Sequence, residues 1–130
     1  MGLVDLAADI KQLMDATGTP VSMGLRIAGQ QTPYIVFDIA NAEAAMVVQG
    51  VVKEVWNVTL QVDCVADKAI DAAGVADSVI AEFTGPMNMG NYTLVLVGAS
   101  AASRTETPDD GQQDAERILT LTLTIIAREN

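Results

Sequence analysis

The feature that most constrains this chain is a strict two-residue alternation of apolar and polar side chains, present in two separate stretches. The apolar positions are Trp56, Val58, Leu60, Val62 and Cys64 in the first stretch, and Leu119, Leu121, Leu123 and Ile125 in the second. The residues between them are asparagine, glutamine, aspartate or threonine. Successive side chains of a β-strand point to opposite faces of its sheet. The pattern therefore predicts two long strands, over residues 52–65 and 117–127, each with one buried face and one hydrated face.

The alternation also assigns individual residues to the two faces. Trp56 and Leu121 are predicted to face the side of the sheet that helices cover, and Thr59 and Thr122 to face the other side. A shift of one residue in either strand would exchange the faces. The assignment can therefore be tested residue by residue.

Two other stretches repeat their apolar residues with the spacing of a helix. Residues 3–17 carry Leu3, Leu6, Ala7, Ile10, Leu13 and Met14 on one stripe, with Asp5, Asp9, Lys11 and Asp15 off it. Residues 68–83 carry Ile70, Ala73, Ala76, Val79, Ile80 and Phe83, preceded by Asp67 as an expected N-cap. Each stretch is followed by a glycine and a proline that end the helix, Gly18 with Pro20 and Gly85 with Pro86.

The remaining segments complete the expected topology. Residues 21–27 and 33–39 are predicted to form a pair of strands, residues 41–45 a turn, and residues 92–97 a further strand. Residues 98–114 are small and polar, which predicts a long loop that is either functional or mobile. The whole order favours an α+β fold in which two helices pack on one face of a mainly antiparallel, four- to five-stranded sheet. Residues 1–130 are expected to form a single domain.

The charge of the chain excludes several kinds of partner. The sequence holds 17 Asp and Glu residues against 7 Lys and Arg residues, for a formal net charge of −10. Such a surface lacks the density of positive charge that binding to nucleic-acid phosphates requires, and it is repelled by anionic membranes. No apolar run approaches the roughly 20 residues that cross a bilayer. We therefore expect no membrane association and no specific binding of DNA.

The sequence offers little material for catalysis. It contains no histidine and one cysteine, Cys64, which lies on the apolar face of a predicted strand. Serine–histidine and cysteine–histidine nucleophiles and the common zinc sites are therefore excluded. Asp109, Asp110 and Gly111 resemble part of a calcium loop, but Pro108 and Glu106 stand where alternating ligands are needed. We expect no enzyme activity, no metal and no cofactor.

Several segments in a fixed order resemble the tail terminator, or tail completion, family of long-tailed bacteriophages. The central part of the resemblance is Leu60-Gln61-Val62-Asp63-Cys64-Val65-Ala66-Asp67, followed by a helix that holds Ala76-Asp77-Ser78-Val79. The amphipathic first helix and the Pro33-Tyr34-Ile35-Val36 strand entry extend it toward the N-terminus. The final strand, opened by Arg117 after an acidic loop with Glu106, Pro108 and Asp109, extends it toward the C-terminus.

This resemblance implies a non-enzymatic virion protein that caps the head-proximal end of the tail tube as a ring, usually of six subunits, and joins it to the neck. The protein would be made in the host cytoplasm. Its partners would be other copies of itself, the tail tube protein and the neck or connector proteins, with DNA passing through unbound. The candidate residues for the subunit interface or the lumen are Arg104, Glu106, Asp109 and Asp110, with carboxylates expected to line the bore.

Three alternatives stay open at this point. The chain could be another head–tail joining or neck protein on a related scaffold, or a cellular binding module. It could also be an enzyme with a carboxylate site, which a turnover screen would reveal.

Overall fold

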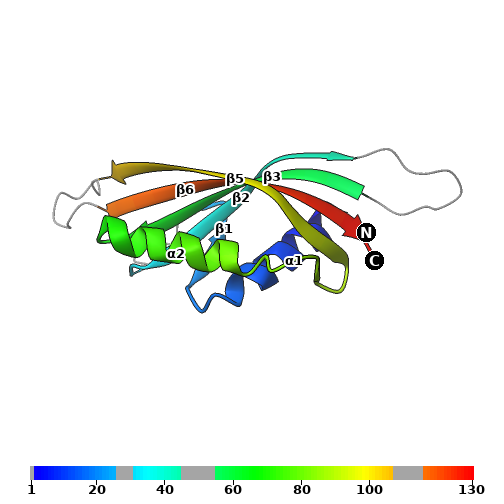
Figure 1. Ribbon diagram of the computed structural model, residues 1–130, viewed down its shortest axis with the longest axis horizontal. Coiled ribbons are helices and arrows are strands. Elements are labelled where there is room, and N and C mark those ends of the chain that lie inside the picture. Colours follow the sequence, from blue (N-terminus) through cyan, green and yellow to red (C-terminus); the bar gives the residue numbers. More distant parts are fainter. Residues whose placement is uncertain (1, 26–30, 45–54, 107–115) are drawn as a thin grey trace, which may run out of the picture.

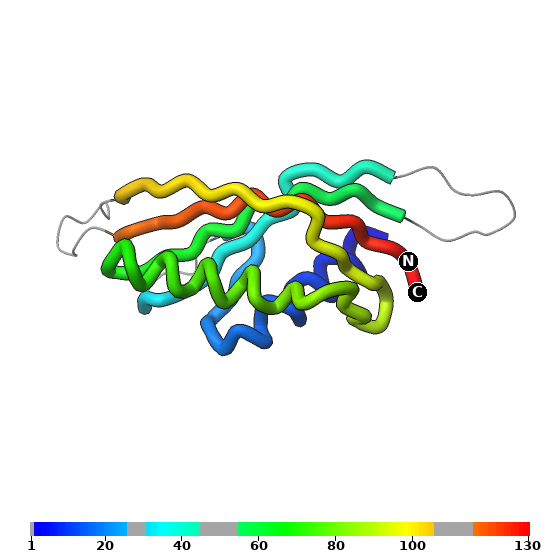
Figure 2. Tube along the Cα trace, viewed as in Figure 1, coloured from blue at the N-terminus to red at the C-terminus, as the bar shows by residue number. Residues whose placement is uncertain are grey.

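A computed structural model describes residues 2–25, 31–44, 55–106 and 116–130 of the chain. Its two helices lie together beneath one curved sheet, and the two termini lie near each other at one end (Figure 1). The tube in Figure 2 shows the same two layers without the ribbon. The expected α+β class, with both helices on one face of the sheet, is therefore confirmed.

Six described strands form the sheet in the order β1-β2-β3-β6-β5-β4. Their bounds are Val21–Met23 for β1, Tyr34–Ala44 for β2, Val55–Ala66 for β3, Met87–Asn88 for β4, Tyr92–Glu106 for β5 and Glu116–Glu129 for β6. The prediction of four to five strands is therefore too low. The sheet is also mixed, because β1 and β2 pair in parallel while every other pair is antiparallel. The three residues of β1 span only about 10 Å. The connection to the parallel strand β2 therefore has to run back over only that short distance.

The two alternating stretches form the centre of the sheet, where β3 and β6 pair along their whole lengths. Val62 lies opposite Leu121, and Gln61 opposite Thr122. Leu121 is buried in the main core, and Trp56 packs against that core. Thr122 is exposed on the opposite face of the sheet, the face shared by Thr59. The predicted assignment of faces is therefore confirmed.

The helices α1, Leu3–Asp15, and α2, Ala69–Ala81, cover the apolar face. The core that they close contains Leu6, Ile10 and Met14 from α1, and Val75, Ala76 and Val79 from α2, against the inward side chains of β2, β3, β5 and β6. Two parts of the predicted stripes are wrong. Leu3 is 45% exposed and Ile70 is 77% exposed, because each lies in the first turn of its helix, beyond the edge of the core.

Asp9 is a further departure, since it was expected off the stripe and is buried at 2% exposure. Its Oδ2 accepts a hydrogen bond from the backbone N–H of Tyr92 at 2.8 Å, and its Oδ1 accepts one from Asn91 Nδ2 at 3.1 Å. A buried carboxylate is tolerated where hydrogen bonds replace its lost hydration. Asp9 thus joins α1 to the start of β5.

Three predicted boundaries are wrong, and the two that concern strands share one reason. The third concerns Asp67, whose carboxylate accepts a hydrogen bond from Thr32 Oγ1 instead of capping a helix. Residues 98–106 were expected in a loop and form the second half of β5. Residues 41–44 were expected in a turn and continue β2, and Asp67 does not cap α2, whose N-cap is Lys68. Small residues have low intrinsic β propensity, but pairing with a long neighbour overrides it, because the backbone of that neighbour also needs hydrogen-bond partners. Residues 107–114 of the expected loop lie outside the described ranges.

Candidate assembly interface

The most extensive candidate surface is the face of the sheet opposite the helices. In the part of the chain that the structure describes, neither helix packs there (Figure 1). Thr122 and Thr124 are exposed on it, whereas Tyr34, Val65 and Ile118 form a small buried apolar cluster near one end, where Gly24 and Leu25 border the face. A sheet face of this kind can remain hydrated or meet another protein. We call it the open face.

Three strands are linked across the open face by one polar network. Arg104 on β5 donates to Thr120 Oγ1 on β6 at 3.0 Å and to Asp63 Oδ2 on β3 at 3.3 Å. Thr120 Oγ1 in turn donates to Asp63 Oδ1 at 2.7 Å. The Arg104 side chain is 49% exposed, so solvent screens this ion pair and its contribution to stability is small. The network orients Arg104 along the sheet and leaves part of its charge at the surface.

Beside this network, Tyr34 and Glu116 form a second, buried polar contact. The Tyr34 hydroxyl donates to Glu116 Oε2 at 3.0 Å, and both side chains are at most 5% exposed. A cavity of about 220 Å³ borders the pair and is also lined by Arg104 and Asp63. The alternation in the sequence placed Asp63 and Thr120 on the polar face. It gave no sign that Tyr34 and Glu116 would meet, because they are far apart in the chain.

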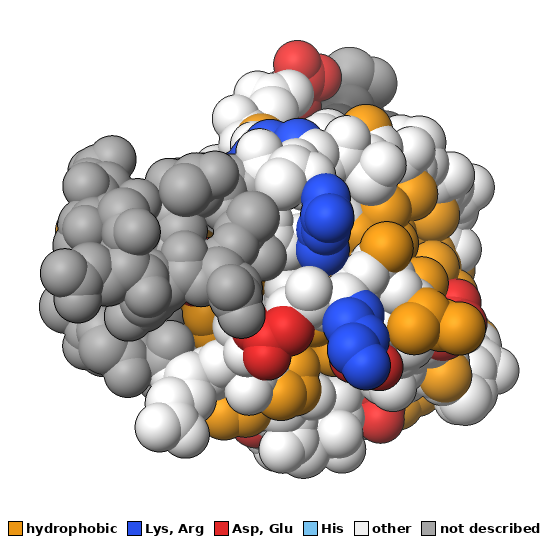
Figure 3. All heavy atoms as spheres, turned by 90° about the vertical axis from the view of Figure 1, so that its left-hand side faces the viewer, with side chains coloured by type: hydrophobic (Ala, Val, Ile, Leu, Met, Phe, Trp, Pro, Cys, Tyr) orange, Lys and Arg blue, Asp and Glu red, His pale blue; other side chains and the backbone are white. Residues whose placement is uncertain are grey.

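Basic side chains gather at the end of the molecule where β5 ends and β6 begins. Arg104 and Arg117 lie on these strands, Arg117 donates to Thr105 Oγ1, and Lys68 precedes α2 at the same end. Figure 3 looks onto this end and shows Lys and Arg side chains beside hydrophobic and acidic ones. A cavity of about 230 Å³ lies between the start of α2 and the two strands, and Arg104 and Arg117 line it. Asp63 and Glu116 lie beside Arg104, and Asp67 and Asp71 lie near Lys68, so positive and negative side chains alternate at this end.

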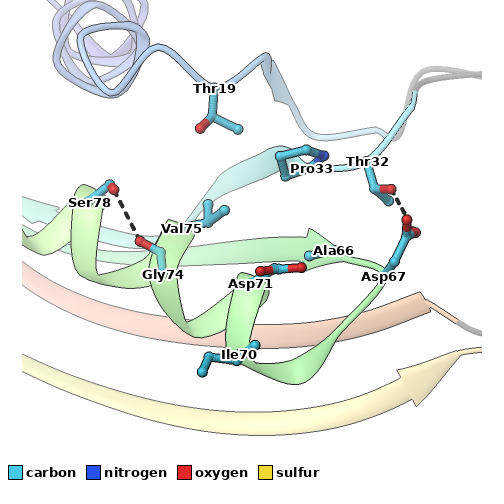
Figure 4. Close-up of a pocket in the computed structure, with 10 residues that line it drawn as sticks. All are labelled: Thr19, Thr32, Pro33, Ala66, Asp67, Ile70, Asp71, Gly74, Val75 and Ser78. Carbon is cyan, nitrogen blue, oxygen red and sulfur yellow. Dashed lines mark hydrogen bonds between the residues drawn. The ribbon is translucent and has the colours of Figure 1, made fainter.

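A groove of about 350 Å³ lies on the helix side of the sheet, between α2 and the segments that carry Thr19 and Pro33 (Figure 4). Asp67 and Asp71 lie on one side of it, and Thr32 Oγ1 donates to Asp67 Oδ1 at 2.7 Å. The exposed Ile70 lines it as well. The groove combines apolar side chains with two carboxylates. It could therefore accommodate a peptide segment that carries one apolar and one basic side chain.

The structure places only part of the predicted interface set. Arg104 lies in the network of the open face, and Glu106 is the last residue of β5, paired in register with Glu116. Asp109 and Asp110 lie outside the described residues. At the end of β5, the described residues Arg104 and Arg117 lie next to Glu106 in the strand register. Of the three carboxylates predicted to line a bore, only Glu106 therefore lies within the described residues.

Cys64 is buried in the core, as its place in the alternation predicts. Burial raises the pKa of its thiol to about 12, and the negative charge of Asp63 adds to the rise. A thiol of this kind stays protonated and unreactive at neutral pH.

Two features are absent from the described residues. Across residues 2–25, 31–44, 55–106 and 116–130, no three His, Cys, Asp or Glu side chains are grouped so that they could hold a metal ion. Within the same ranges, no helix has both the length and the apolar character needed to cross a membrane.

Comparison with known proteins adds a likeness of fold. No protein-family model matches the chain, and no curated protein matches it. Among solved structures, the chain is similar to one from the virion of a native gene transfer agent particle. The two share 18% sequence identity and a TM-score of 0.48 over 94% of this chain and 92% of the other. At this identity and TM-score, the likeness does not reveal what the chain does.

Proposed function

We propose that the chain is a structural, non-enzymatic protein of a phage-like virion. In the finer form of the proposal, it forms a ring that closes the head-proximal end of the tail tube and joins it to the neck. The resemblance of its sequence to tail terminator proteins supports this assignment. The structural observation that carries it is the combination of an open face with long strand edges that lack a neighbour in the described sheet. These are surfaces that a second protein chain can cover.

The proposed ring is built by heterologous contacts, in which one patch of a subunit meets a different patch of the next. Repetition of such a contact closes into a ring when the rotation between neighbours divides a full turn. We expect six subunits, as the resemblance implies. One face of the ring would then meet the tail tube protein, and the other would meet the neck or connector proteins.

Charge suits such a ring to the passage of DNA. Six copies carry a formal charge of about −60, six times the −10 of one chain. Carboxylates on the bore would keep the duplex hydrated and unattached, whereas a wall of Lys and Arg would bind its phosphates and slow it. Screening at physiological salt limits this effect to roughly 8 Å from the wall. An assembled ring whose bore is lined mainly by Arg104, Arg117 or Lys53 would contradict this part of the proposal.

The decisive experiment combines the purified chain with tail tube protein encoded beside it. Light scattering gives the mass of the chain alone and in the mixture, and electron microscopy shows where it binds on polymerised tubes. We expect a closed ring at one end of each tube and an arrest of tube growth. A chain that stays monomeric at high concentration, both alone and with tube protein, contradicts the proposal.

The same mixture separates the alternatives. A chain that ignores tubes but binds the connector or neck proteins would be a different head–tail joining protein. Binding only to proteins of the host would favour a cellular module. A screen for hydrolysis of common ester, phosphate and glycoside substrates tests the non-enzymatic part of the proposal, and reproducible turnover that copurifies with the chain would contradict it.

A further inference from the structure

Both edges of the sheet contain a stretch of strand that lacks a neighbour among the described strands. β4 pairs with β5 only at Thr93 and Leu94, which leaves the edge of residues 95–106 uncovered. At the other side, β1 pairs with β2 only over residues 35–37, which leaves residues 39–44 uncovered. Uncovered edges present backbone N–H and C=O groups that can pair with another strand. We call these stretches the β5 edge and the β2 edge.

Neither edge is well protected against such pairing. Monomeric proteins commonly shield edge strands with proline, lysine, β-bulges or very short strands. Neither the β5 edge nor the β2 edge contains proline or lysine. The charged residues of the β5 edge are Arg104, which is turned over the open face toward Asp63, and Glu106 at its last position. Each strand has one irregularity of register, at residues 96–98 and 39–41, and is otherwise regularly paired on its inner side.

The topology makes the two edges complementary to each other. β2, β3, β6 and β5 are neighbours in that order, and each pair is antiparallel, so β2 and β5 run in opposite directions. If a second copy lies beside the first in the same orientation, its β2 therefore runs antiparallel to the β5 of the first copy. Through the register of the sheet, Ile39 lies level with Ala99. The uncovered parts of the two edges therefore lie level over residues 39–43 and 95–99. β1 of the second copy lies level with residues 101–103, so the second copy must turn away from β5 beyond residue 99, as the rotation between neighbours in a ring allows.

We infer that the β5 edge of one copy pairs antiparallel with the β2 edge of the next, so that the sheet continues from subunit to subunit. Pairing of β5 with a second β5 would cover one edge and leave the β2 edge exposed. The head-to-tail contact covers part of both. This inference rests on the proposed ring and names the contact that builds it.

Cysteine cross-linking tests the inference directly. Asn41→Cys places a thiol on the β2 edge and Ser100→Cys places one on the β5 edge, both at exposed positions. The native Cys64 is buried and does not compete. Each single variant, the double variant and a control double variant, Asn41→Cys with Ala8→Cys on the exposed side of α1, are treated with a short bismaleimide. Light scattering of the untreated proteins is recorded in parallel.

The expected result is a ladder of dimer, trimer and larger species from the edge double variant, with loss of the ladder in both single variants and in the control. Dimers from Ser100→Cys alone would show that β5 pairs with itself and overturn the inference. A ring seen by light scattering without a ladder would overturn the edge contact and leave the proposed ring standing. A monomer with no cross-linking would overturn both.

Discussion

Replacement of Leu121 by alanine tests the assignment of the sheet faces most directly. Leu121 is 2% exposed and belongs to the main core. The substitution removes three buried carbon atoms, and at about 0.8 kcal/mol for each the transfer cost is about 2.4 kcal/mol. Its β3 neighbour Val62 is held by the backbone pairing of β3 and β6, so the space can close only in part. The residual cavity adds to the cost, and we expect a loss of about 3 kcal/mol, within the ~2–5 kcal/mol range of such changes.

The matched control is Thr122→Ala, one residue further along the same strand. Thr122 is exposed on the open face, where it lies opposite Gln61 on β3 and Ser100 on β5. Its removal loses only β propensity and cross-strand contact, which together amount to less than about 1 kcal/mol. The backbone, strand and neighbours are otherwise shared by the two variants.

Urea unfolding measures both variants through the fluorescence of Trp56, the single tryptophan, which packs against the core. Protein concentration must be held constant, because self-association raises apparent stability. A loss of about 3 kcal/mol is a large part of the roughly 5–15 kcal/mol that stabilises a typical domain, so the midpoint should fall clearly. Equal losses, or a larger loss for Thr122→Ala, would refute the assignment of the faces of β6.

Three further predictions concern polar and thiol groups of the interior. Asp9→Ala removes the acceptor of the Tyr92 backbone N–H and should cost about 1–3 kcal/mol of unfolding free energy, measured by the same urea titration; an unchanged midpoint would show that the contact is dispensable. Tyr34→Phe removes the hydroxyl that donates to Glu116 and should cost about 1–2 kcal/mol, whereas a stabilised variant would contradict the role of this hydrogen bond. Cys64 should resist iodoacetamide at pH 8 in the native protein and react quickly in urea, because its pKa of about 12 keeps the folded thiol protonated; rapid native labelling, read by mass spectrometry, would show that the core opens.

The central strands could be predicted from the sequence because their side chains alternate without interruption. Residues such as Val62 and Leu121 must all be buried together, and a period of two achieves this only in an extended chain. The helices could be predicted for the same reason, from a period near 3.6. Their outermost residues could not, because burial of Ile70 depends on whether the sheet extends beneath the first turn of α2.

The candidate interface depended on tertiary structure. The alternation alone decided that one face of the sheet is apolar and the other rich in threonine, and the composition alone decided the net charge of −10. Only the folded chain decided that residues 98–106 extend β5 along β6, that Arg104 meets Asp63, and that Asp9 is buried against Tyr92. These features depend on which strands are neighbours and in what register. Side-chain periodicity determines which residues of an element share a face, but the partner of that face, and of each strand edge, is set by the packing of segments that are distant in the chain.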